Sequence, residues 1–363
     1  MTADVDCPAL AQLRDRIRAA AADRQPLRIR GGGTKDFYGE VIAGDIMDVN
    51  AIAGIVAYAP GELVMTARAG TPLVEIEAAL AEHDQMLAFE PPHHGAAATL
   101  GGIVATGFSG PRRAQAGAVR DFILGVRIVD GTGEALGFGG QVIKNVAGFD
   151  VSRLMTGALG TLGVLTEISL KILPRPRAET TRVLACSGPE ALQRVNEWGG
   201  KPLPVSATCH VDGRLFVRLS GAPAAIASAI RDIGGDEMDG AAFWRSVRDQ
   251  THERLVAATR DGAALWRLSV RSTAPWLDVA GDQVVEWGGA LRWIVVDGRT
   301  AASSTLRSWA AEHGGQATLY RGTDKSAGVF QSLPAPMVAL HQRLKQVFDP
   351  QHVLNRGRLL AQF

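Results

Sequence analysis

Cysteine is scarce in this sequence of 363 residues, which contains only Cys7, Cys186 and Cys209. An odd number of widely separated cysteines argues against a disulfide framework. The sequence also has no C-x-x-C motif, so we expect neither an iron–sulfur cluster nor a structural zinc ion bound by this chain. The predicted metal content is therefore none.

Long hydrophobic runs and an excess of one charge are absent as well. We find no uninterrupted apolar stretch of the ~18 residues that a membrane-spanning helix needs. The first residues, Met1–Asp6, are acidic and lack the basic and then apolar pattern of a signal peptide. The formal net charge of +1 gives no support for nucleic acid or an anionic membrane surface as the main partner. We expect a cytoplasmic protein with no nucleic-acid partner.

Glycine, in contrast, is abundant, and its most distinctive cluster follows a predicted strand. Leu27–Arg30 alternates apolar and basic side chains, as expected for a strand with one buried face. It leads directly into Gly31, Gly32 and Gly33, whose backbone N–H groups can surround an anion such as a diphosphate. Arg30 and Lys35 are the candidate counter-charges, and a glycine-rich turn without a ligand is the alternative. We expect Gly32 to be required, because a side chain would oppose a positive φ and block the phosphates.

Two familiar phosphate-binding motifs do not fit this loop. The residues after Gly33 show no helical periodicity, which a Rossmann fingerprint requires. The spacing around Gly33-Thr34-Lys35 does not match a P-loop. Any phosphate site here must therefore belong to a different scaffold.

A second glycine-dense region consists of two stretches, Thr99–Gly110 and Gly157–Gly163, flanked by predicted strands. Glycine there lets backbone lie directly against a planar, extended ligand. The sequence Gly107-Phe108-Ser109-Gly110 is one residue short of a G-x-S-x-G nucleophile elbow, so we reject Ser109 as a hydrolase nucleophile.

Local patterns predict both helices and strands. The predicted helices carry apolar faces at helical spacing: Leu10, Leu13, Ile17 and Ala20; Leu73, Ile76 and Leu80; segments starting at Pro189, Ala224 and Ser304; and Met337, Leu340, Leu344 and Val347. The predicted strands alternate or are β-branched: Leu63–Ala67, Phe122–Val129, Val164–Leu173, Thr181–Cys186, Val205–Val211, Leu215–Leu219, Leu291–Val296 and Ala317–Tyr320. A repeated strand, helix and Gly-Gly pattern after Pro174–Arg177 predicts an antiparallel sheet with helices on one face. The fold class is therefore α+β.

Four motifs and a C-terminal pattern now identify a family resemblance. They are R-G-G-G-T at Arg30–Thr34, A-T-L-G-G-x-x-A-T-G at Ala98–Gly107, K-N-V-A-G-F-D at Lys144–Asp150, G-x-L-G-T-L-G-V-L-T-E at Gly157–Glu167, and the tail Asp349–Arg358. The chain resembles FAD-binding proteins of the vanillyl-alcohol oxidase/p-cresol methylhydroxylase type. The resemblance implies a two-lobed FAD-binding domain at 1–175, an α+β cap domain at 176–330, and a C-terminal segment at 331–363 that returns to the FAD domain.

The resemblance also implies the cofactor, FAD, and the residues that hold it. Arg30, Gly31, Gly32, Gly33, Thr34 and Lys35 would wrap the pyrophosphate; Pro91, Thr99, Gly101, Gly102, Ala105, Thr106, Ser109 and Gly110 would line the flavin and ribityl chain; Gly160, Gly163 and Val164 would approach the adenine. Some relatives attach FAD covalently through a histidine of the triglycine-like loop. Thr34 and Lys35 occupy that place here, so we expect non-covalent FAD.

Within the family, the sequence is similar to the smaller FAD-binding subunits of bacterial glycolate oxidases, notably at Pro111–Arg113, Val119–Asp121 and Trp287–Trp293. This resemblance implies oxidation of glycolate to glyoxylate with a larger FAD-binding subunit and an iron–sulfur subunit, through which the chain would be peripheral at the inner membrane. Relatives that oxidise 2-hydroxy acids themselves carry metal-binding histidines, and nothing between Arg177 and Phe330 matches them. We therefore expect the larger subunit to oxidise most of the substrate, with Trp287 and Trp293 helping to contact it.

Two alternatives stay open: a self-sufficient FAD-dependent 2-hydroxy-acid (D-lactate or glycolate) dehydrogenase, and a structural subunit with non-catalytic FAD. Several residues also keep more than one interpretation. His93 and His94 either shape a turn, lie near the flavin or bind a metal. Arg112 and Arg113 either bind a carboxylate or face a partner. Lys144-Asn145 either meets the flavin or braces a hairpin. No catalytic residue is assigned.

Overall fold

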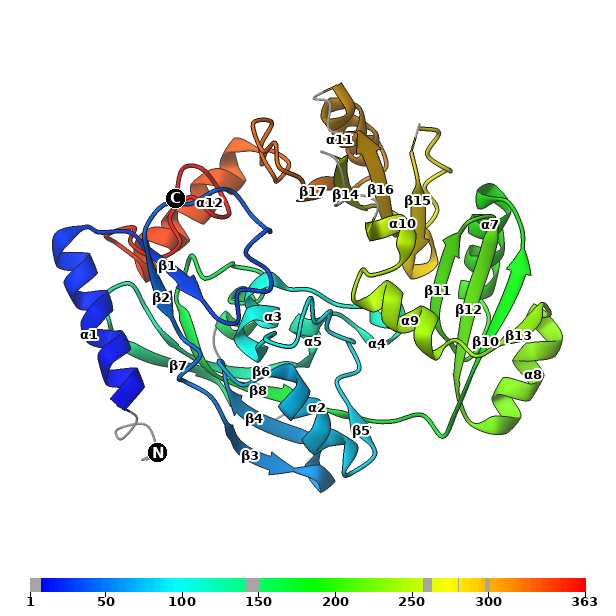
Figure 1. Cartoon of the computed structure of the whole chain (residues 1–363), viewed down its shortest axis with the longest axis horizontal. Helices are drawn as coiled ribbons and strands as arrows, with labels where there is room; N and C mark the ends of the chain where they lie inside the picture. Colours follow the sequence, from blue (N-terminus) through cyan, green and yellow to red (C-terminus); the bar gives the residue numbers. More distant parts are fainter. Residues whose placement is uncertain (1–7, 141–149, 257–262, 280, 298–300) are drawn as a thin grey trace.

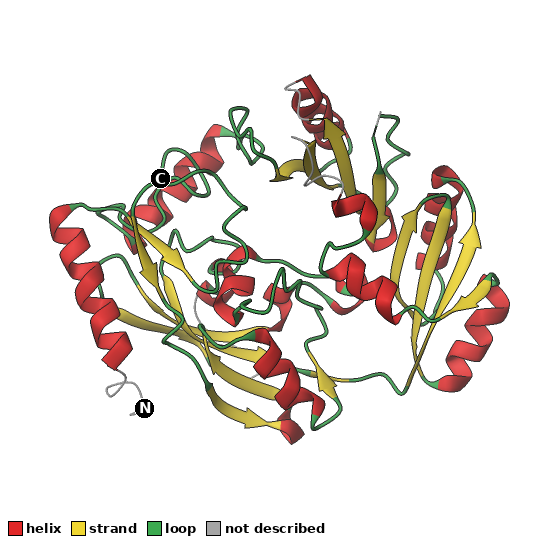
Figure 2. Cartoon of the chain, viewed as in Figure 1, coloured by secondary structure: helices red, strands yellow, loops and turns green. Residues whose placement is uncertain are grey.

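The computed structural model describes residues 8–140, 150–256, 263–279, 281–297 and 301–363. Cys7 and the motif residues Lys144–Phe149 lie outside the described residues, so their predicted roles are not addressed below. Figures 1 and 2 show two sheet-containing parts joined by loops, with the C-terminal helix α12 (Ala335–Phe348) beside the first part.

The first part of the chain contains short helices and three sheets. Its helices are α1 (Pro8–Asp23), α2 (Leu73–Ala81), α3 (Leu100–Thr106), α4 (Arg113–Ala116), α5 (Val119–Phe122), α6 (Val151–Leu154) and the 3-10 turn η1 (Pro60–Glu62). Its strands are β1 (Leu27–Arg30), β2 (Asp45–Asp48), β3 (Ile55–Ala59), β4 (Val64–Arg68), β5 (Gln85–Met86), β6 (Ile123–Val129), β7 (Ala135–Gly139), β8 (Val164–Lys171) and β9 (Leu173–Pro174). The predicted strands in this region agree with these bounds to within two residues.

A five-stranded antiparallel sheet, in the order β3-β4-β8-β6-β7, supports the first part. Helices α2 and α3 pack on it and bury a common core. The predicted apolar face of α2 is confirmed: Leu73, Ile76 and Leu80 are fully buried. Helix α3 was not predicted, because its sequence LGGIVAT is rich in glycine and β-branched residues that disfavour helix. Tertiary packing of Ile103 and Val104 outweighs that preference.

The parallel pair β1-β2 forms a separate small sheet beside α1. All four predicted face residues of α1 are buried: Leu10, Leu13, Ile17 and Ala20. The other side of β1 is covered by the end of the chain, since the Leu27 N–H donates to the Val353 carbonyl and the Asn355 N–H donates to the Leu27 carbonyl. The segment after α12 therefore holds the strand that precedes the triglycine loop.

The second part contains a single eight-stranded antiparallel sheet in the order β13-β10-β12-β11-β15-β16-β14-β17. Its strands are β10 (Ala178–Ala185), β11 (Val205–Val211), β12 (Arg214–Gly221), β13 (Asp236–Met238), β14 (Ala263–Ser269), β15 (Gln283–Glu286), β16 (Leu291–Asp297) and β17 (Gln316–Arg321). Its helices are α7 (Gly188–Gly199), α8 (Pro223–Ile233), α9 (Ala241–Arg248), α10 (Glu253–Val256), α11 (Ala301–Glu312) and the 3-10 turn η3 (Trp287–Gly289). A short pairing of β11 with β15 joins the two four-stranded halves.

The repeated helices α7, α8 and α11 cover one face of this sheet, as the strand, helix and Gly-Gly pattern predicted. Helices α9 and α10 contribute Trp244, Val247 and Leu255 to the core on the other face. That second core also contains Tyr38, Phe108 and Leu159 from the first part of the chain. The face of the sheet bearing Trp293 and Tyr320 is therefore packed against the glycine-rich loops.

Candidate functional site: a glycine-lined cavity

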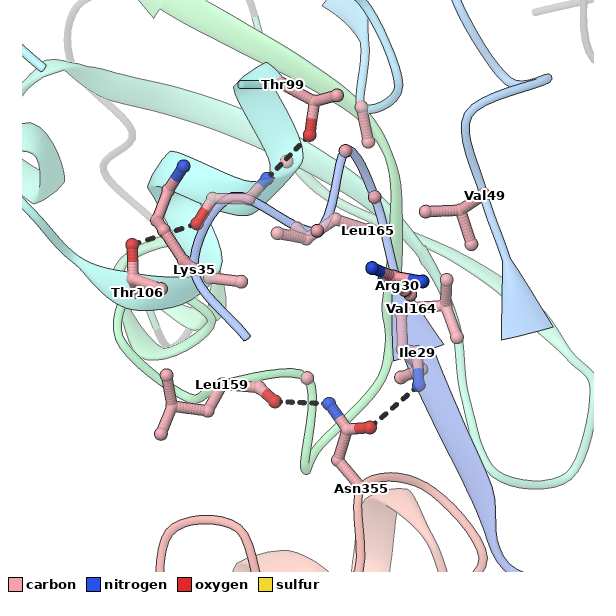
Figure 3. Close-up of a pocket in the computed structure, with 18 of the residues that line it drawn as sticks. Ile29, Arg30, Lys35, Val49, Thr99, Thr106, Leu159, Val164, Leu165 and Asn355 are labelled. Atoms are coloured by element: carbon pink, nitrogen blue, oxygen red, sulfur yellow. Dashed lines mark hydrogen bonds between the residues drawn. The ribbon is translucent and has the colours of Figure 1, made fainter. Parts of the chain in front are cut away.

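The triglycine loop forms one wall of a cavity of about 100 Å³. Figure 3 shows the cavity between β1, helix α3 and the loop that contains Leu159. A cavity enclosed by these three segments explains why the two glycine-dense regions of the sequence, far apart along the chain, come together here.

The glycines of the loop are required by close packing. A Cβ atom at Gly31 would lie 2.7 Å from Thr99 Oγ1, and one at Gly32 would overlap the Ala97 carbonyl group. The expected positive φ is found at Gly33 (+70°) and not at Gly32. The positive φ expected at Gly32 was therefore wrong, and close packing of the loop against the 97–99 segment is what requires glycine there.

Helix α3 presents its first turn to the same cavity. Thr99 caps the helix, and its Oγ1 accepts a hydrogen bond from the Gly102 N–H at 3.2 Å. A Cβ atom at Gly101 would lie 2.8 Å from the Cβ of Ala69, so this glycine lets the helix pack against the end of β4. At the next turn, Thr106 Oγ1 donates to the Gly102 carbonyl at 2.9 Å. The cap and the two glycines place backbone, without bulky side chains, along the cavity wall.

The opposite wall depends on Asn355, which comes from the C-terminal segment. Its Oδ1 accepts from the Ile29 N–H at 2.8 Å, and its Nδ2 donates to the Leu159 carbonyl at 2.6 Å. A Cβ atom at Gly160 would lie 2.8 Å from the same Nδ2, so glycine is needed for the loop to lie against Asn355. Asn355 therefore fixes the distance between β1 and the second glycine loop.

The charged side chains that line the cavity carry an excess of two positive charges. They are Arg30, Lys35 and Arg358 against a single carboxylate, Asp36. Asp36 pairs with Arg30 Nε at 2.9 Å and with Arg28 at 3.3 Å. Such a lining suits a ligand with two negative charges.

Lys35 is the least compensated of these cations. It is 7% exposed, its Nζ donates to Thr34 Oγ1 at 3.0 Å, and among the described residues it has no carboxylate within ion-pair distance. Burial lowers the pKa of Lys35 to about 8, so the side chain is still protonated at pH 7. A buried ammonium without a counter-charge is costly. Binding an anion beside it would remove that cost.

The cavity brings together most of the site residues predicted from the sequence. Fourteen of them line it: Arg30, Gly31, Gly32, Gly33, Thr34, Lys35, Thr99, Gly101, Gly102, Ala105, Thr106, Gly160, Gly163 and Val164. Pro91, Ser109 and Gly110 are not among the lining residues. Ser109 Oγ accepts from the Val119 N–H at the start of α5, and the Gly110 carbonyl accepts from the Trp287 indole at 3.0 Å.

The sequence interpretation missed several lining residues, including Ile29, Val49, Leu159, Asn355 and Arg358. Two of these had a visible signal, because Asn355 and Arg358 belong to the C-terminal pattern used for the resemblance. The apolar residues had none, since ordinary strand or loop residues become part of a cavity only through tertiary packing.

His94 joins the edge of this site to the second sheet. Arg321 donates to His94 Nδ1 at 3.2 Å, so the neutral ring carries its proton on Nε2, which donates to the Tyr320 hydroxyl at 3.0 Å. Burial, aided by Arg321 and Lys35, lowers the pKa of His94 to about 3. With both nitrogens engaged and the ring neutral, His94 links the two parts of the chain.

His93 has a separate role. Its ring Nε2 lies 3.0 Å from Glu77 Oε1, and its backbone N–H donates to Asp249 Oδ1 at 3.1 Å. Within the described ranges, no group of three or more His, Cys, Asp or Glu side chains is placed to hold a metal ion. The turn-shaping interpretation of the two histidines is the one that these contacts support.

The structure separates the two neighbouring arginines. Arg112 is buried and pairs with Glu90 at 3.4 Å and Glu179 at 2.8 Å. The guanidinium carbon of Arg113 lies 4.4 Å from the ring centroid of Trp287, with Arg267 at 5.3 Å from the same centroid. In the described part of the chain, neither Arg113 nor Arg267 has a carboxylate within ion-pair distance. Arg113 therefore keeps the capacity to bind a carboxylate that Arg112 has lost.

The predicted role of Trp287 and Trp293 in partner contact is wrong. Trp287 is 5% exposed and its indole donates to the Gly110 carbonyl; Trp293 is 3% exposed and its indole donates to Glu286 Oε1 at 2.7 Å. Burial raises the pKa of Glu286 to about 7, although the hydrogen bond from Trp293 opposes the shift. Trp287 connects the two parts of the chain, and Trp293 bonds within the second sheet.

Comparisons with known proteins extend these observations. The family described as "FAD binding domain" matches residues 4–139. The glycolate oxidase subunit GlcE of Escherichia coli is 46% identical over 98% of this chain and 99% of its own length. The D-lactate dehydrogenase of Archaeoglobus fulgidus is 33% identical over 50% of this chain and 41% of its own. The glycolate oxidase subunit GlcD of Bacillus subtilis is 37% identical over 23% of this chain and 18% of its own.

Among solved structures, alkyldihydroxyacetonephosphate synthase superposes with a TM-score of 0.66 at 15% identity, covering 95% of this chain and 74% of that one. This likeness confirms the predicted α+β fold class. Among the described residues, no helix is long and apolar enough to cross a membrane. The cavity, the family match and the near full-length similarity agree on FAD as the cofactor. The chain belongs to the family of the glycolate oxidase subunit GlcE, a family of FAD-dependent oxidoreductases.

Proposed function

We propose that this chain is the FAD-carrying subunit of a glycolate oxidase (glycolate dehydrogenase) complex, which oxidises glycolate to glyoxylate. The observation that carries the proposal is the 46% identity to GlcE along almost the whole of both chains. The partners in the proposal are a larger FAD-binding subunit and an iron–sulfur subunit. The similarity of this chain to a subunit named GlcD supports the first of them.

In the proposed site, Arg30–Lys35 hold the FAD diphosphate, and the first turn of α3 lies on the flavin and ribityl side. The excess of two positive charges in the cavity matches the two charges of a diphosphate, and the backbone at Gly31–Gly33 leaves room for close approach. Gly160, Gly163 and Val164 take the adenine side, and Ala105 and Thr106 the ribityl side. Pro91, Ser109 and Gly110, which do not line this cavity, would border the flavin. Bound FAD supplies the two-electron redox chemistry.

We further propose that FAD is held without a covalent bond, because Thr34 and Lys35 occupy the place of an attachment histidine. The division into a FAD-binding domain (1–175), a cap domain (176–330) and a returning C-terminal segment (331–363) is part of the same proposal. The seating of Leu27 against Val353 and Leu354 supports the return of that segment. The cytoplasmic location, with the inner membrane reached through the complex, stays a prediction.

A second function is favoured by one specific observation. Arg113 and Arg267 lie over Trp287, at 4.4 and 5.3 Å from its ring, with no carboxylate paired to either among the described residues. Guanidinium groups in this state can bind the carboxylate of a 2-hydroxy acid. The chain would then oxidise glycolate or D-lactate by itself, in keeping with its similarity to a D-lactate dehydrogenase.

Anaerobic stopped-flow absorbance separates the two functions. The purified chain is mixed with excess glycolate or D-lactate without oxygen, and flavin bleaching is followed. We expect slow or no bleaching by the isolated chain, and turnover with an artificial acceptor once the larger flavoprotein and the iron–sulfur subunit are added. Complete bleaching within seconds would replace the proposal by the self-sufficient dehydrogenase. In that case Arg113→Gln and Arg267→Gln should raise KM, whereas a colourless chain that cannot take up FAD would favour a structural subunit.

A further inference from the structure

Helix α12 exposes an apolar stripe. Met337, Leu340 and Val347 are 42%, 41% and 73% exposed, and Leu344 between them is half-buried. Only seven large hydrophobic side chains are exposed in the described part of the chain, and three of them are on this one helix. The sequence pattern placed these four residues on one face; the fold packs Leu344 partly against the core and leaves Met337, Leu340 and Val347 exposed.

The stripe cannot turn inward, because a neighbouring face of α12 is already fixed to the body of the molecule. Lys345 is fully buried, and its Nζ donates to the Thr161 and Leu354 carbonyls at 2.8 Å and to Asp349 Oδ2 at 2.7 Å. Phe348 packs into the core under the five-stranded sheet. The exposed face is therefore a constant feature of the folded chain.

The spacing of the stripe fits a second helix. Met337, Leu340, Leu344 and Val347 follow one another at intervals of three, four and three residues, the pattern of helix-to-helix packing. They span eleven residues, or about 15 Å of helix. Figure 1 shows α12 at the periphery of the molecule, beside the C-terminus.

The charges around the stripe indicate the chemistry of the partner. Helix α12 contains no Asp or Glu. Arg343 is exposed, and it lies on the outer edge of the stripe between Leu340 and Val347 in helical geometry. A partner helix should therefore carry carboxylates beside its own apolar side chains.

Helix α12 also lies next to the cavity. Its buried Lys345 contacts the Thr161 carbonyl in the loop whose residues Leu159, Gly160 and Gly163 line the cavity. A partner bound to the exposed stripe would lie one helix away from that wall. In the proposed FAD site this wall is the adenine side, where Gly160 and Gly163 lie.

We propose that the exposed stripe of α12 docks an amphipathic helix with acidic flanks that belongs to the second flavoprotein subunit of the complex. The inference rests on the proposed function, since it needs that subunit to exist. It assigns to the C-terminal helix the contact that Trp287 and Trp293, being buried, do not make.

The test is co-purification of the full-length tagged chain, co-expressed with the second flavoprotein subunit and the iron–sulfur subunit. Leu340→Glu and Val347→Glu place a carboxylate in the stripe. Gln342→Glu adds the same charge on the far side of the helix, at an exposed position, and serves as the matched control. We expect each stripe variant to retain about tenfold less second flavoprotein, and Gln342→Glu to retain as much as wild type. FAD content and Tm of the isolated chains should be the same in all cases.

A charge reversal adds an independent measurement. Arg343→Glu should also weaken retention about tenfold, and wild-type retention should fall with rising NaCl concentration. Equal retention by wild type and the stripe variants would overturn the inference while leaving the proposed function intact. A wild-type dimer that Val347→Glu converts to monomer, with complex assembly unchanged, would also overturn it in favour of a second copy. A wild-type chain that retains no partner would remove the proposed function and the inference together.

Discussion

The Cα atom of Gly32 lies directly against the carbonyl group of Ala97, so that any Cβ atom at position 32 would overlap it. This contact joins the triglycine loop to the segment that leads into α3, and both line the cavity. Gly32→Ala should push the two segments apart. Because each lost charge-assisted hydrogen bond to a phosphate costs about 1.5–3 kcal/mol, we expect FAD affinity to fall at least ~10-fold.

Flavin fluorescence titration of the FAD-depleted chain measures this loss. Gly61→Ala is the matched control, because a Cβ atom there meets nothing within 4 Å and its φ is not positive. Wild-type affinity in Gly32→Ala would show that the loop does not touch the cofactor.

Lys35 should make stability depend on pH in a defined direction. Burial lowers its pKa from 10.5 to about 8, so between these pH values the unfolded chain binds more protons at this side chain than the folded chain. Stability contributed by Lys35 therefore rises as pH increases from 8 to 10.5. The FAD-free Lys35→Met variant should have a higher Tm than wild type at pH 7, and the difference should shrink through that window.

Binding of FAD should give wild type a higher Tm than Lys35→Met, because the ammonium group of Lys35 then has an anion beside it. Differential scanning fluorimetry of both proteins, with and without FAD, provides the comparison. A Tm difference that stays constant from pH 7 to 10.5 would contradict an uncompensated buried Lys35.

Asn355 should matter for both stability and cofactor binding. Asn355→Ala leaves the Ile29 N–H and the Leu159 carbonyl without their partner. Each unpaired group should lower the free energy of unfolding by about 1–3 kcal/mol. Asn355 also has a φ of 40°, which Ala tolerates poorly. Urea unfolding of Asn355→Ala and Asn355→Gly separates the two effects, since Gly loses the amide bonds but accepts the backbone conformation. Unchanged stability in both would refute the bridging role.

The Lys345–Asp349 pair should show strong coupling. Both side chains are fully buried, and Asp349 also accepts the N–H groups of Val353 and Leu354. Lys345→Met leaves a buried carboxylate without its cation, which should lower the free energy of unfolding by about 3–5 kcal/mol. The double variant Lys345→Met/Asp349→Asn should lower the free energy of unfolding by less than the sum of the two single changes. Additive costs would mean that the pair does not act as a unit.

The flavin should be released intact when the protein is denatured. This expectation follows from Thr34 and Lys35 in the place where some relatives have an attachment histidine. Acid precipitation followed by absorbance of the supernatant provides the measurement. Yellow colour that stays with the precipitated polypeptide would show a covalent bond.

Local sequence signals were sufficient for most of the secondary structure. The buried face of α1, the Ser187–Glu190 capping box that begins α7 and the Asp212-Gly213 turn between β11 and β12 all involve residues within a few positions of one another. Short-range hydrogen bonds and apolar periodicity determine such features, and both are visible in the sequence. The glycine-rich motifs at 31–33, 99–110 and 157–163 also indicated the cavity, through the lack of side chains at its walls.

Tertiary structure alone decided what these elements meet. Ile29 and Asn355 are 326 positions apart, yet their hydrogen bond sets the width of the cavity. Arg112 and Arg113 are neighbours in sequence, but only Arg112 has Glu90 and Glu179 within reach. Trp287 is covered whereas Val347 is exposed, although both are apolar residues in regular patterns. Periodicity determines which side chains share a face, and the folding of distant segments determines whether that face is covered, because burial depends on contacts that no local pattern encodes.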